Sequence, residues 1–118
     1  MSENVILDKS KAFALRIIKL YQYLCDQKKE YVLSKQVLRS GTSIGANVRE
    51  SIYAQSRADF VSKLSIALKE SSETEYWIEL LHESGFVDDK TFDSIFDDNS
   101  KISATLINII KKTKESEK

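Results

Sequence analysis

Charged and polar side chains that could do chemistry recur at helical spacing in two stretches of this 118-residue chain. The first stretch carries a guanidinium, a hydroxyl, an amide and a carboxylate at intervals of four, four and three residues: Arg39, Ser43, Asn47 and Glu50. The second places two carboxylates, Glu70 and Glu73, on one helical face with Trp77. Two carboxylates so close could share one proton as an acid–base pair, or both could pair with a cation. Ionised groups set among apolar side chains require a partner, whereas the first stretch could also be an ordinary solvated helix face.

Antiparallel pairing of the two stretches supplies that partner. We place the turn between them at Gln55 and Ser56. Arg39 then lies level with the interval between Glu70 and Glu73. Because a guanidinium matches carboxylate geometry, this register predicts an ion pair between Arg39 and the two glutamates and favours a structural role over a shared proton. Such a pair could form within one chain or between two chains.

The rest of the chain offers little for catalysis. His82 is the single histidine, which excludes a ferritin-like di-metal site because that site takes a Glu-x-x-His pair from each of two helices. The sequence pairs no nucleophilic side chain with a plausible general base, as nucleophilic catalysis would require. It also has no glycine-rich loop after a strand, which is where a phosphate-binding loop would lie. We interpret His82 as a packed or helix-terminal side chain. The sequence therefore predicts a protein that is not an enzyme and that holds no metal and no cofactor.

Four long helices are expected to position these side chains. The chain has no proline and three glycines, so few residues interrupt a helix, and no segment alternates as a strand does. Apolar periodicity predicts helices at about 8–27, 34–54, 57–84 and 88–113. Because short connections make successive helices antiparallel, we predict a single all-α domain, 1–118, with the architecture of an up-down-up-down four-helix bundle.

Cap residues mark the predicted ends of these helices. Ser34 is expected to start the second helix, and Ser56, with Asp59 three residues later, to start the third. Gly85 is suited to the left-handed conformation that closes the third helix. The fourth helix is expected to start at Asp88.

Gly41 and Gly45 lie inside the predicted second helix, where each costs about 1 kcal/mol relative to alanine. Their i, i+4 spacing puts both on one flank of that helix. Another helix backbone can approach closely where side chains are missing. We therefore predict a close helix–helix contact at the two glycines and not a phosphate-binding site.

The first predicted helix carries more apolar surface than one bundle covers. Its apolar residues form two adjacent stripes: Phe13, Ile17, Leu20 and Leu24 in one, and Ala14, Ile18, Tyr21 and Cys25 in the other. Together the stripes cover roughly 160° of the helix surface, whereas the apolar face of a surface helix usually covers about 100°. Leu15 adds an apolar side chain on the far side. Self-association would cover this surface.

Positive charge gathers at one end of the predicted bundle, although Lys plus Arg and Asp plus Glu balance at 18 each. The basic end comprises Lys9, Lys11, Arg49, Arg57, Lys111, Lys112 and Lys114. We treat these as candidate contacts with RNA or DNA, expected to be weak, non-specific and salt-sensitive because no recognition helix or stacking platform is evident. Two alternatives stay open: lysines that merely complement the helix dipole, and an adaptor that docks another protein and has no nucleic-acid role.

Other features favour a cytoplasmic protein with no membrane association. The chain has no run of about 18 apolar residues and no secretory leader pattern. Its single cysteine, Cys25, excludes an intramolecular disulfide and fits a reducing compartment.

The segment from Leu33 to Glu50, LSKQVLRSGTSIGANVRE, resembles the four-helix-bundle family encoded in intervening sequences of bacterial 23S ribosomal RNA genes. The match continues through Asp59-Phe60, Leu64, Ile66-Ala-Leu-Lys-Glu70 and Glu73-Thr-Glu-Tyr-Trp77. It is close from Tyr31 to Gly85, while the outer helices match only in pattern. Ser51 and Ser71 stand where alanine is most frequent in the family; both are small, and the fold is not in doubt.

This resemblance implies an antiparallel four-helix bundle assembled as a homopentamer. The family has been labelled a ribosomal protein, and it is similar to the accessory variability protein of diversity-generating retroelements, which acts beside a reverse transcriptase and nucleic acid. The family's signature positions fall on Arg39, Ser43, Asn47, Glu50, Lys69, Glu70, Glu73 and Trp77, and the resemblance gives them no catalytic role. We therefore expect a non-enzymatic homo-oligomeric scaffold or accessory protein.

Overall fold

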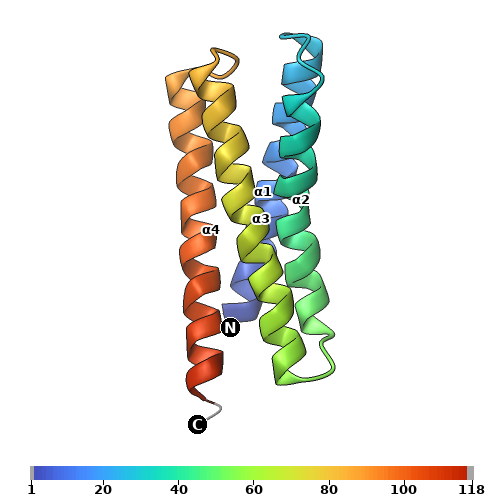
Figure 1. The fold of residues 1–118 in the computed structure, drawn as a ribbon, viewed down its shortest axis with the longest axis vertical. Coiled ribbons are helices and arrows are strands. Elements are labelled where there is room, and N and C mark those ends of the chain that lie inside the picture. Colours follow the sequence, from blue (N-terminus) through green and yellow to red (C-terminus); the bar gives the residue numbers. More distant parts are fainter. Residues whose placement is uncertain (1, 117–118) are drawn as a thin grey trace.

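A computed structural model describes residues 2–116, and within that range four helices form one antiparallel bundle (Figure 1). The helices are α1 (Ser2–Asp26), α2 (Leu33–Ile52), α3 (Arg57–Glu83) and α4 (Asp89–Glu115). The bundle measures 50 × 21 × 20 Å, and each helix packs on the next while α4 closes against α1. The predicted all-α four-helix bundle is confirmed. None of the helices within residues 2–116 is both long enough and apolar enough to cross a membrane.

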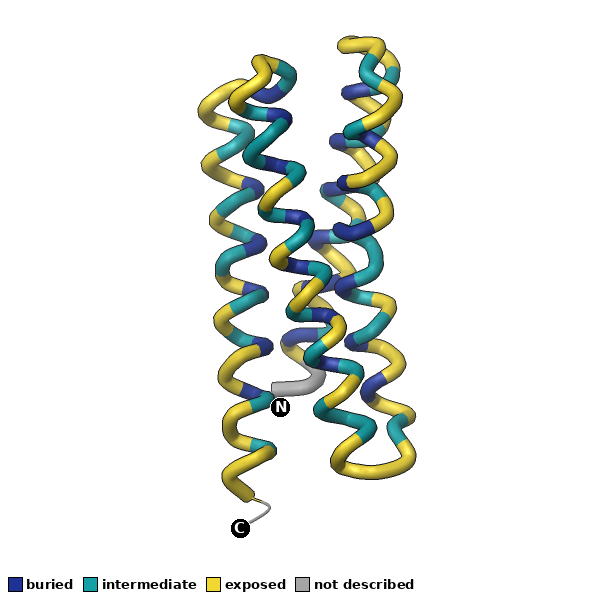
Figure 2. Tube along the Cα trace, viewed as in Figure 1, coloured by how far each residue is buried: buried dark blue, intermediate teal, exposed yellow. Residues whose placement is uncertain are grey.

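The core is built from buried residues that recur at helical spacing along each helix (Figure 2). Phe13, Ile17 and Leu24 of α1 are buried together with Ile44 of α2 and Leu106 of α4. Fully burying a large apolar side chain contributes about 1.5–3 kcal/mol each. The apolar row predicted for the first helix is therefore the row that the bundle buries.

Two polar pairs cross this core. Ser71 Oγ donates to Asn99 Oδ1 at 2.8 Å, and Asn99 Nδ2 donates to the carbonyl of Ser71 at 3.0 Å. The hydroxyls of Thr74 and Ser40 are hydrogen-bonded at 2.9 Å. Because buried polar atoms cost free energy unless they are paired, these contacts favour one register of α3 against both α2 and α4.

Several helix ends differ from the predicted bounds. α1 begins at Ser2 and not near residue 8, because Ile6 is buried and extends the apolar row toward the N-terminus. α2 ends at Ile52 rather than at residue 54, and α4 continues to Glu115 rather than stopping at residue 113.

Glu30 caps the start of α2, so the predicted cap at Ser34 is wrong. The Glu30 carboxylate accepts the backbone N–H groups of Val32 at 3.2 Å, Leu33 at 3.0 Å and Ser34 at 2.7 Å. A carboxylate at this place satisfies unpaired N–H groups and complements the helix dipole. Ser34 is instead buried in the first turn of α2, with its hydroxyl oxygen 3.8 Å from the sulfur of Cys25 on α1.

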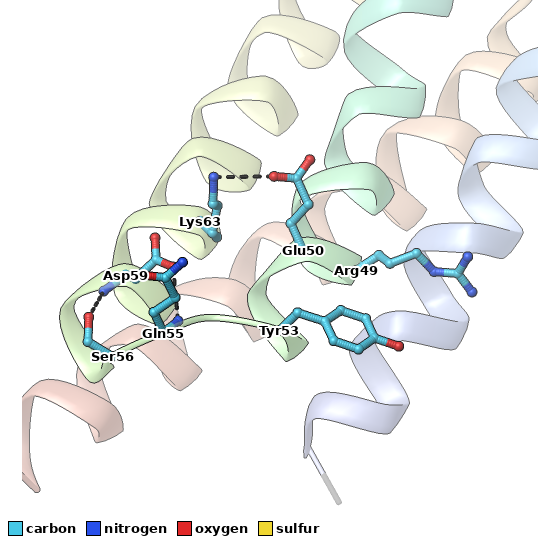
Figure 3. A pocket seen from close by; sticks show the side chains of 7 residues that line it. All are labelled: Arg49, Glu50, Tyr53, Gln55, Ser56, Asp59 and Lys63. Carbon is cyan, nitrogen blue, oxygen red and sulfur yellow. Dashed lines mark hydrogen bonds and ion pairs between the residues drawn. The ribbon is translucent and has the colours of Figure 1, made fainter.

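The starts of α3 and α4 are capped as predicted. Ser56 Oγ accepts the N–H of Asp59 at 3.0 Å, and the Asp59 carboxylate accepts the N–H of Gln55 at 3.2 Å (Figure 3). At α4, Asp88 Oδ1 accepts the N–H of Thr91 at 2.8 Å. Each cap satisfies N–H groups that the first turn of its helix leaves without helical partners.

Gly85 ends α3 in the left-handed conformation, with φ of 87°. The N–H of Gly85 bonds to the carbonyl of His82 at 3.1 Å, and the N–H of Phe86 bonds to that of Leu81 at 2.9 Å. This pair of bonds satisfies carbonyls that the last turn leaves without helical partners. The predicted closure of the third helix is confirmed.

The two glycines of α2 lie against α1. A Cβ added to Gly41 would lie 2.8 Å from the side chain of Ile17, and one added to Gly45 would lie 3.3 Å from the carbonyl oxygen of Ser10. Both neighbours belong to α1, so the partner helix is in the same chain. The low helix propensity of the glycines is offset by this close approach.

Replacing Gly41 with alanine is expected to destabilise the bundle. Alanine would gain about 1 kcal/mol of helix propensity, but its Cβ would clash with Ile17, and overpacking typically costs about 1–3 kcal/mol. Urea unfolding should therefore give Gly41→Ala a lower free energy of unfolding than the wild type. Ala104→Gly, at an exposed site of α4, is the control and should cost about 1 kcal/mol through propensity alone. A Gly41→Ala protein more stable than the wild type would contradict the close contact.

Candidate functional site

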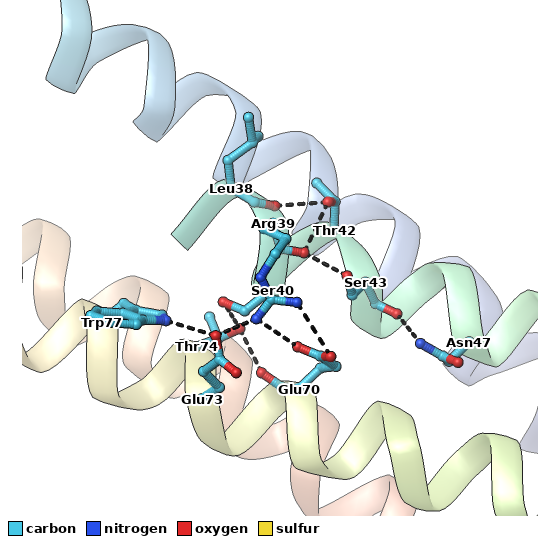
Figure 4. Close-up of polar contacts among 10 residues, drawn as sticks. All are labelled: Leu38, Arg39, Ser40, Thr42, Ser43, Asn47, Glu70, Glu73, Thr74 and Trp77. Carbon is cyan, nitrogen blue, oxygen red and sulfur yellow. Dashed lines mark hydrogen bonds and ion pairs between the residues drawn. The ribbon is translucent and has the colours of Figure 1, made fainter. Parts of the chain in front are cut away.

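The other flank of α2 meets the face of α3 that carries two carboxylates (Figure 4). Arg39 Nη2 lies 3.4 Å from Glu70 Oε1 and also forms an ion pair with Glu73 Oε2. The indole N–H of Trp77 donates to the same Glu73 oxygen at 3.0 Å. One guanidinium thus joins two carboxylates within a single chain, at the level that the antiparallel register predicts.

Glu70 is the more buried of the two carboxylates. Its side chain is 20% exposed, and its Oε1 atom is buried without a hydrogen-bond partner within residues 2–116. A carboxylate oxygen removed from water depends on a neighbouring positive charge, which Arg39 provides. With a guanidinium beside both carboxylates, neither has to share a proton with the other, so the geometry favours a structural ion pair over an acid–base pair.

The remaining signature positions lie outside this network. Ser43 Oγ donates to the carbonyl of Arg39 at 2.6 Å, and Asn47 Nδ2 donates to the carbonyl of Ser43 at 2.9 Å, so both side chains bond to their own helix (Figure 4). Glu50 pairs with Lys63 of α3 at 3.2 Å. Lys69 is exposed on α3. The eight positions therefore divide into a network of four side chains and four separate positions along the same pair of helices.

The basic residues lie toward the end of the bundle where α1 begins, α2 connects to α3 and α4 ends (Figure 1). Two pairs of them are brought together. Lys11 of α1 and Arg49 of α2 line one groove, and Lys111 and Lys114 of α4 line another. Each pair offers two positive charges on one surface, which is enough for a phosphate contact but far from a continuous basic track.

The other predicted basic residues are spread around the bundle. Arg57 Nη1 lies 3.4 Å from the hydroxyl of Ser116, and Lys112 is exposed in the last turn of α4. Lys9 lines a separate groove between α1 and α4. Carboxylates stand among these cations, Asp8 beside Lys11 and Glu115 beside Lys114. The end is therefore mixed in charge, an interleaving that the sequence pattern did not predict.

Tyr53 is an exposed aromatic side chain that was not predicted from the sequence as part of a site. It directly follows α2, is 81% exposed, and lines an open groove together with Arg49. The available signal was an aromatic residue at a helix end beside a short polar connection, Tyr53-Ala-Gln-Ser56. An aromatic surface that could stack with a ligand therefore exists at the basic end.

Residues 2–108 match the protein family described as 23S rRNA-intervening sequence protein. This span takes in α1, α2, α3 and most of α4. The chain belongs to the 23S rRNA-intervening sequence protein family. The family resemblance seen in the segments around Arg39 and Glu70 is thereby confirmed.

A solved structure is similar to this 23S rRNA-intervening sequence protein over nearly its whole length. It is the crystal structure of a protein with unknown function from the S23 ribosomal protein family, from Bacteroides thetaiotaomicron VPI-5482. The two chains are 56% identical, with a TM-score of 0.93 over 94% of this chain and 99% of the other. No curated protein matches this chain significantly. Family membership therefore supports the fold, and a biochemical role has to be argued from the side chains.

The single histidine of this family member lies in the last turn of α3. His82 Nε2 is 2.7 Å from Asp89 Oδ1, and its ring stacks on Phe92 with centroids 4.1 Å apart. His82 is thus both helix-terminal and packed, as the sequence predicts. Within residues 2–116, no group of three or more His, Cys, Asp or Glu side chains is arranged to hold a metal ion.

Hydrogen bonds and charge shift the pKa values of the ion-pair network. The indole N–H of Trp77, followed by the guanidinium of Arg39, stabilises the ionised carboxylate of Glu73 and lowers its pKa. The carboxylates of Glu73 and Glu70 in turn raise the pKa of Arg39. Both shifts favour the charged forms, so Arg39 and Glu73 form an ionised pair at neutral pH.

Replacing Glu73 with glutamine is expected to make folding less sensitive to acid. The folded-state pKa of Glu73 is below the unfolded value of about 4.3. Its contribution to stability is therefore complete above that pH and is lost as the pH falls through the folded-state pKa. The free energy of unfolding, measured in urea from about pH 7 down to about pH 2, should fall less steeply for Glu73→Gln than for the wild type.

Two further measurements serve as controls for the acid dependence of Glu73→Gln. Trp77→Phe keeps an aromatic ring but removes the indole N–H, so its acid-dependent loss should lie between those of the wild type and Glu73→Gln. At pH 7 the Glu73→Gln protein should already be the less stable of the two, since the ion pair with Arg39 is gone. Identical acid slopes for the wild type and Glu73→Gln would contradict a contribution of this pair to folding.

Proposed function

We propose that this family member is a non-enzymatic helical scaffold that assembles as a homo-oligomer, expected to be a pentamer from the family resemblance. The observation that carries the proposal is apolar surface on the outside of α1. Leu15 is 55% exposed and Ile18 is 36% exposed in the single chain. Exposed apolar patches mark interaction surfaces when they are contiguous, and a further copy of the chain would cover this one.

The surface beside these residues also suits a neighbouring helix. Ala14 of α1 lines a groove of about 310 Å³ together with Thr42, Gly45 and Ala46 of α2. Small side chains allow another helix to come close. In a cyclic pentamer the contact is heterologous, so this α1–α2 surface of one copy would meet a different surface of the next copy.

The proposal includes weak contact with RNA or DNA at the basic end. A ring with parallel bundles would repeat the Lys11–Arg49 and Lys111–Lys114 pairs in every copy, and several weak sites would act together. Such a scaffold would work in the cytoplasm, as an accessory factor of the kind that the resemblance to the accessory variability protein implies. An adaptor that docks another protein, with no nucleic-acid role, is the competing function and is favoured by the same apolar surface of α1.

Native mass spectrometry should find the wild-type protein at five chain masses. Leu15→Lys combined with Ile18→Lys should shift the population toward monomer, because burying unpaired ammonium groups in an interface is costly. The fold should survive, since both side chains lie on the outside of the bundle. Asn108→Lys, at an exposed position of α4, adds charge elsewhere and should leave the assembly intact. A wild-type protein that stays monomeric at micromolar concentration would overturn the assembly proposal.

Filter binding to structured RNA and duplex DNA should show binding at low salt that weakens as salt is added. Lys111→Ala with Lys114→Ala should weaken it and reduce the slope of log affinity against log salt by about 0.7–0.9 for each phosphate that is no longer neutralised. Lys28→Ala with Lys29→Ala removes two exposed lysines from the α1–α2 connection at the other end of the bundle and is the matched control. Absence of binding at low salt would rule out the nucleic-acid part and favour the adaptor.

A further inference from the structure

An open groove of about 540 Å³ lies at the corner where α2 connects to α3 (Figure 3). Its lining comprises Arg49, Glu50, Tyr53, Gln55, Ser56, Asp59 and Lys63. The groove is wide and open, so a ligand would bind on its surface and not inside a closed pocket. The groove shares no residue with the Arg39 network, and through Arg49 it adjoins the α1–α2 groove.

Most charged groups in this groove already have partners. Glu50 and Lys63 neutralise each other at 3.2 Å. The Asp59 carboxylate accepts the N–H of Gln55 at 3.2 Å, and its own N–H is bonded to the hydroxyl of Ser56. The acidic side chains are therefore occupied by an ion pair and a helix cap, which reduces their repulsion of an anionic ligand.

Arg49 is the cationic side chain and Tyr53 the aromatic side chain of this lining that have no contact with the other lining residues. Figure 3 draws no contact from either one to the other lining residues, and both extend from the end of α2 to the same side, toward α1. The backbone N–H of Tyr53 bonds to the carbonyl of Glu50 at 3.1 Å, which fixes the base of the side chain while the residue stays 81% exposed. Arg49 also lines the adjoining α1–α2 groove, where Lys11 adds a second cation and Asp8 a carboxylate, so the two cations outnumber the one acid.

This combination has a specific chemical complement. An exposed phenol ring offers a π-face to a planar heterocycle, and a guanidinium can stack on that heterocycle or bind a phosphate. A base paired in a duplex hides its faces in the stack, whereas an unpaired base presents them. An acidic peptide would satisfy Arg49 and Lys11 but would leave the tyrosine ring unused.

We infer that this groove binds an unpaired nucleotide of a single-stranded RNA or DNA, with the base stacked on Tyr53 and the phosphates held by Arg49 and Lys11. The inference rests on the proposed nucleic-acid contact and adds the form of the strand and the residue that recognises it. Lys11 and Arg49 then belong to one site, and the Lys111–Lys114 pair supplies a separate, purely electrostatic contact.

Fluorescence polarisation with labelled 12-nucleotide single-stranded RNA, single-stranded DNA and a duplex of the same sequence tests this site at low salt. Tyr53→Leu should weaken single-strand binding by about 5- to 150-fold, the range that removal of one stacking partner produces. Tyr53→Phe should bind like the wild type because it keeps the ring.

Tyr31→Leu removes a comparably placed exposed tyrosine from the α1–α2 connection and should have no effect. Duplex binding should be the same for all four proteins, and the RNA and DNA arms identify the preferred strand.

The outcomes separate this inference from the wider proposal. Duplex and single-strand binding that are both insensitive to Tyr53→Leu would overturn the Tyr53 site and leave the basic end as a nucleic-acid contact. Equal losses for Tyr53→Leu and Tyr53→Phe would also overturn it, because the hydroxyl and not the ring face would then make the contact. Tyr53-dependent binding of a labelled acidic peptide in place of the strand would overturn it in favour of a protein partner. Absence of binding to every nucleic acid at low salt would remove the inference and the nucleic-acid proposal together.

Discussion

The close approach of α1 to α2 at Gly41 is the constraint on which the rest of the structure depends. A helix has a single rotation about its axis, so once the glycine flank of α2 faces α1, the direction of every other residue of α2 is set. Ile44 and Val48 then point into the core, and Arg39 emerges on the side that faces α3. The absence of a side chain at Gly41, where a Cβ would lie 2.8 Å from Ile17, thus determines where the largest polar network forms.

The ion-pair network of Arg39, Glu70, Glu73 and Trp77 connects α2 to α3. Arg39 spans from α2 to two carboxylates of α3, and Trp77 holds one of them from the next turn. An exposed ion pair of this kind contributes little by itself, about 0–1 kcal/mol. The main effect of the ion pair is on the register of α2 and α3, because a shift of α3 by one turn would leave the buried Oε1 atom of Glu70 without the positive charge of Arg39. The presence of Arg39, Glu70, Glu73 and Trp77 therefore has a sufficient physical explanation in folding.

The proposed interactions with other molecules use surfaces that lie outside the core. The outside of α1 carries apolar side chains that suit another copy, while the end of the bundle carries separated cations and Tyr53. The two surfaces meet along the α1–α2 groove, which has Ala14 on its apolar part and Lys11 with Arg49 toward the end. Assembly would therefore place the proposed nucleotide sites near the contacts between copies, and partial burial of one surface would shape access to the other.

The sequence by itself determined the number of helices, their antiparallel order, most of their caps and the level at which Arg39 meets Glu70 and Glu73. These features follow from the apolar periodicity of each helix and from the short α2–α3 connection, both of which can be recognised from residues close together in the sequence. The cap by Glu30 is local, and sequence reasoning missed it because glutamate is not among the residues preferred at a helix N-cap. The structure was needed for features that depend on segments far apart. The early start of α1 reflects burial of Ile6 against the other helices. The exposure of Tyr53 likewise appears only in the folded bundle, because burial depends on how the helices pack and is not a property of one helix.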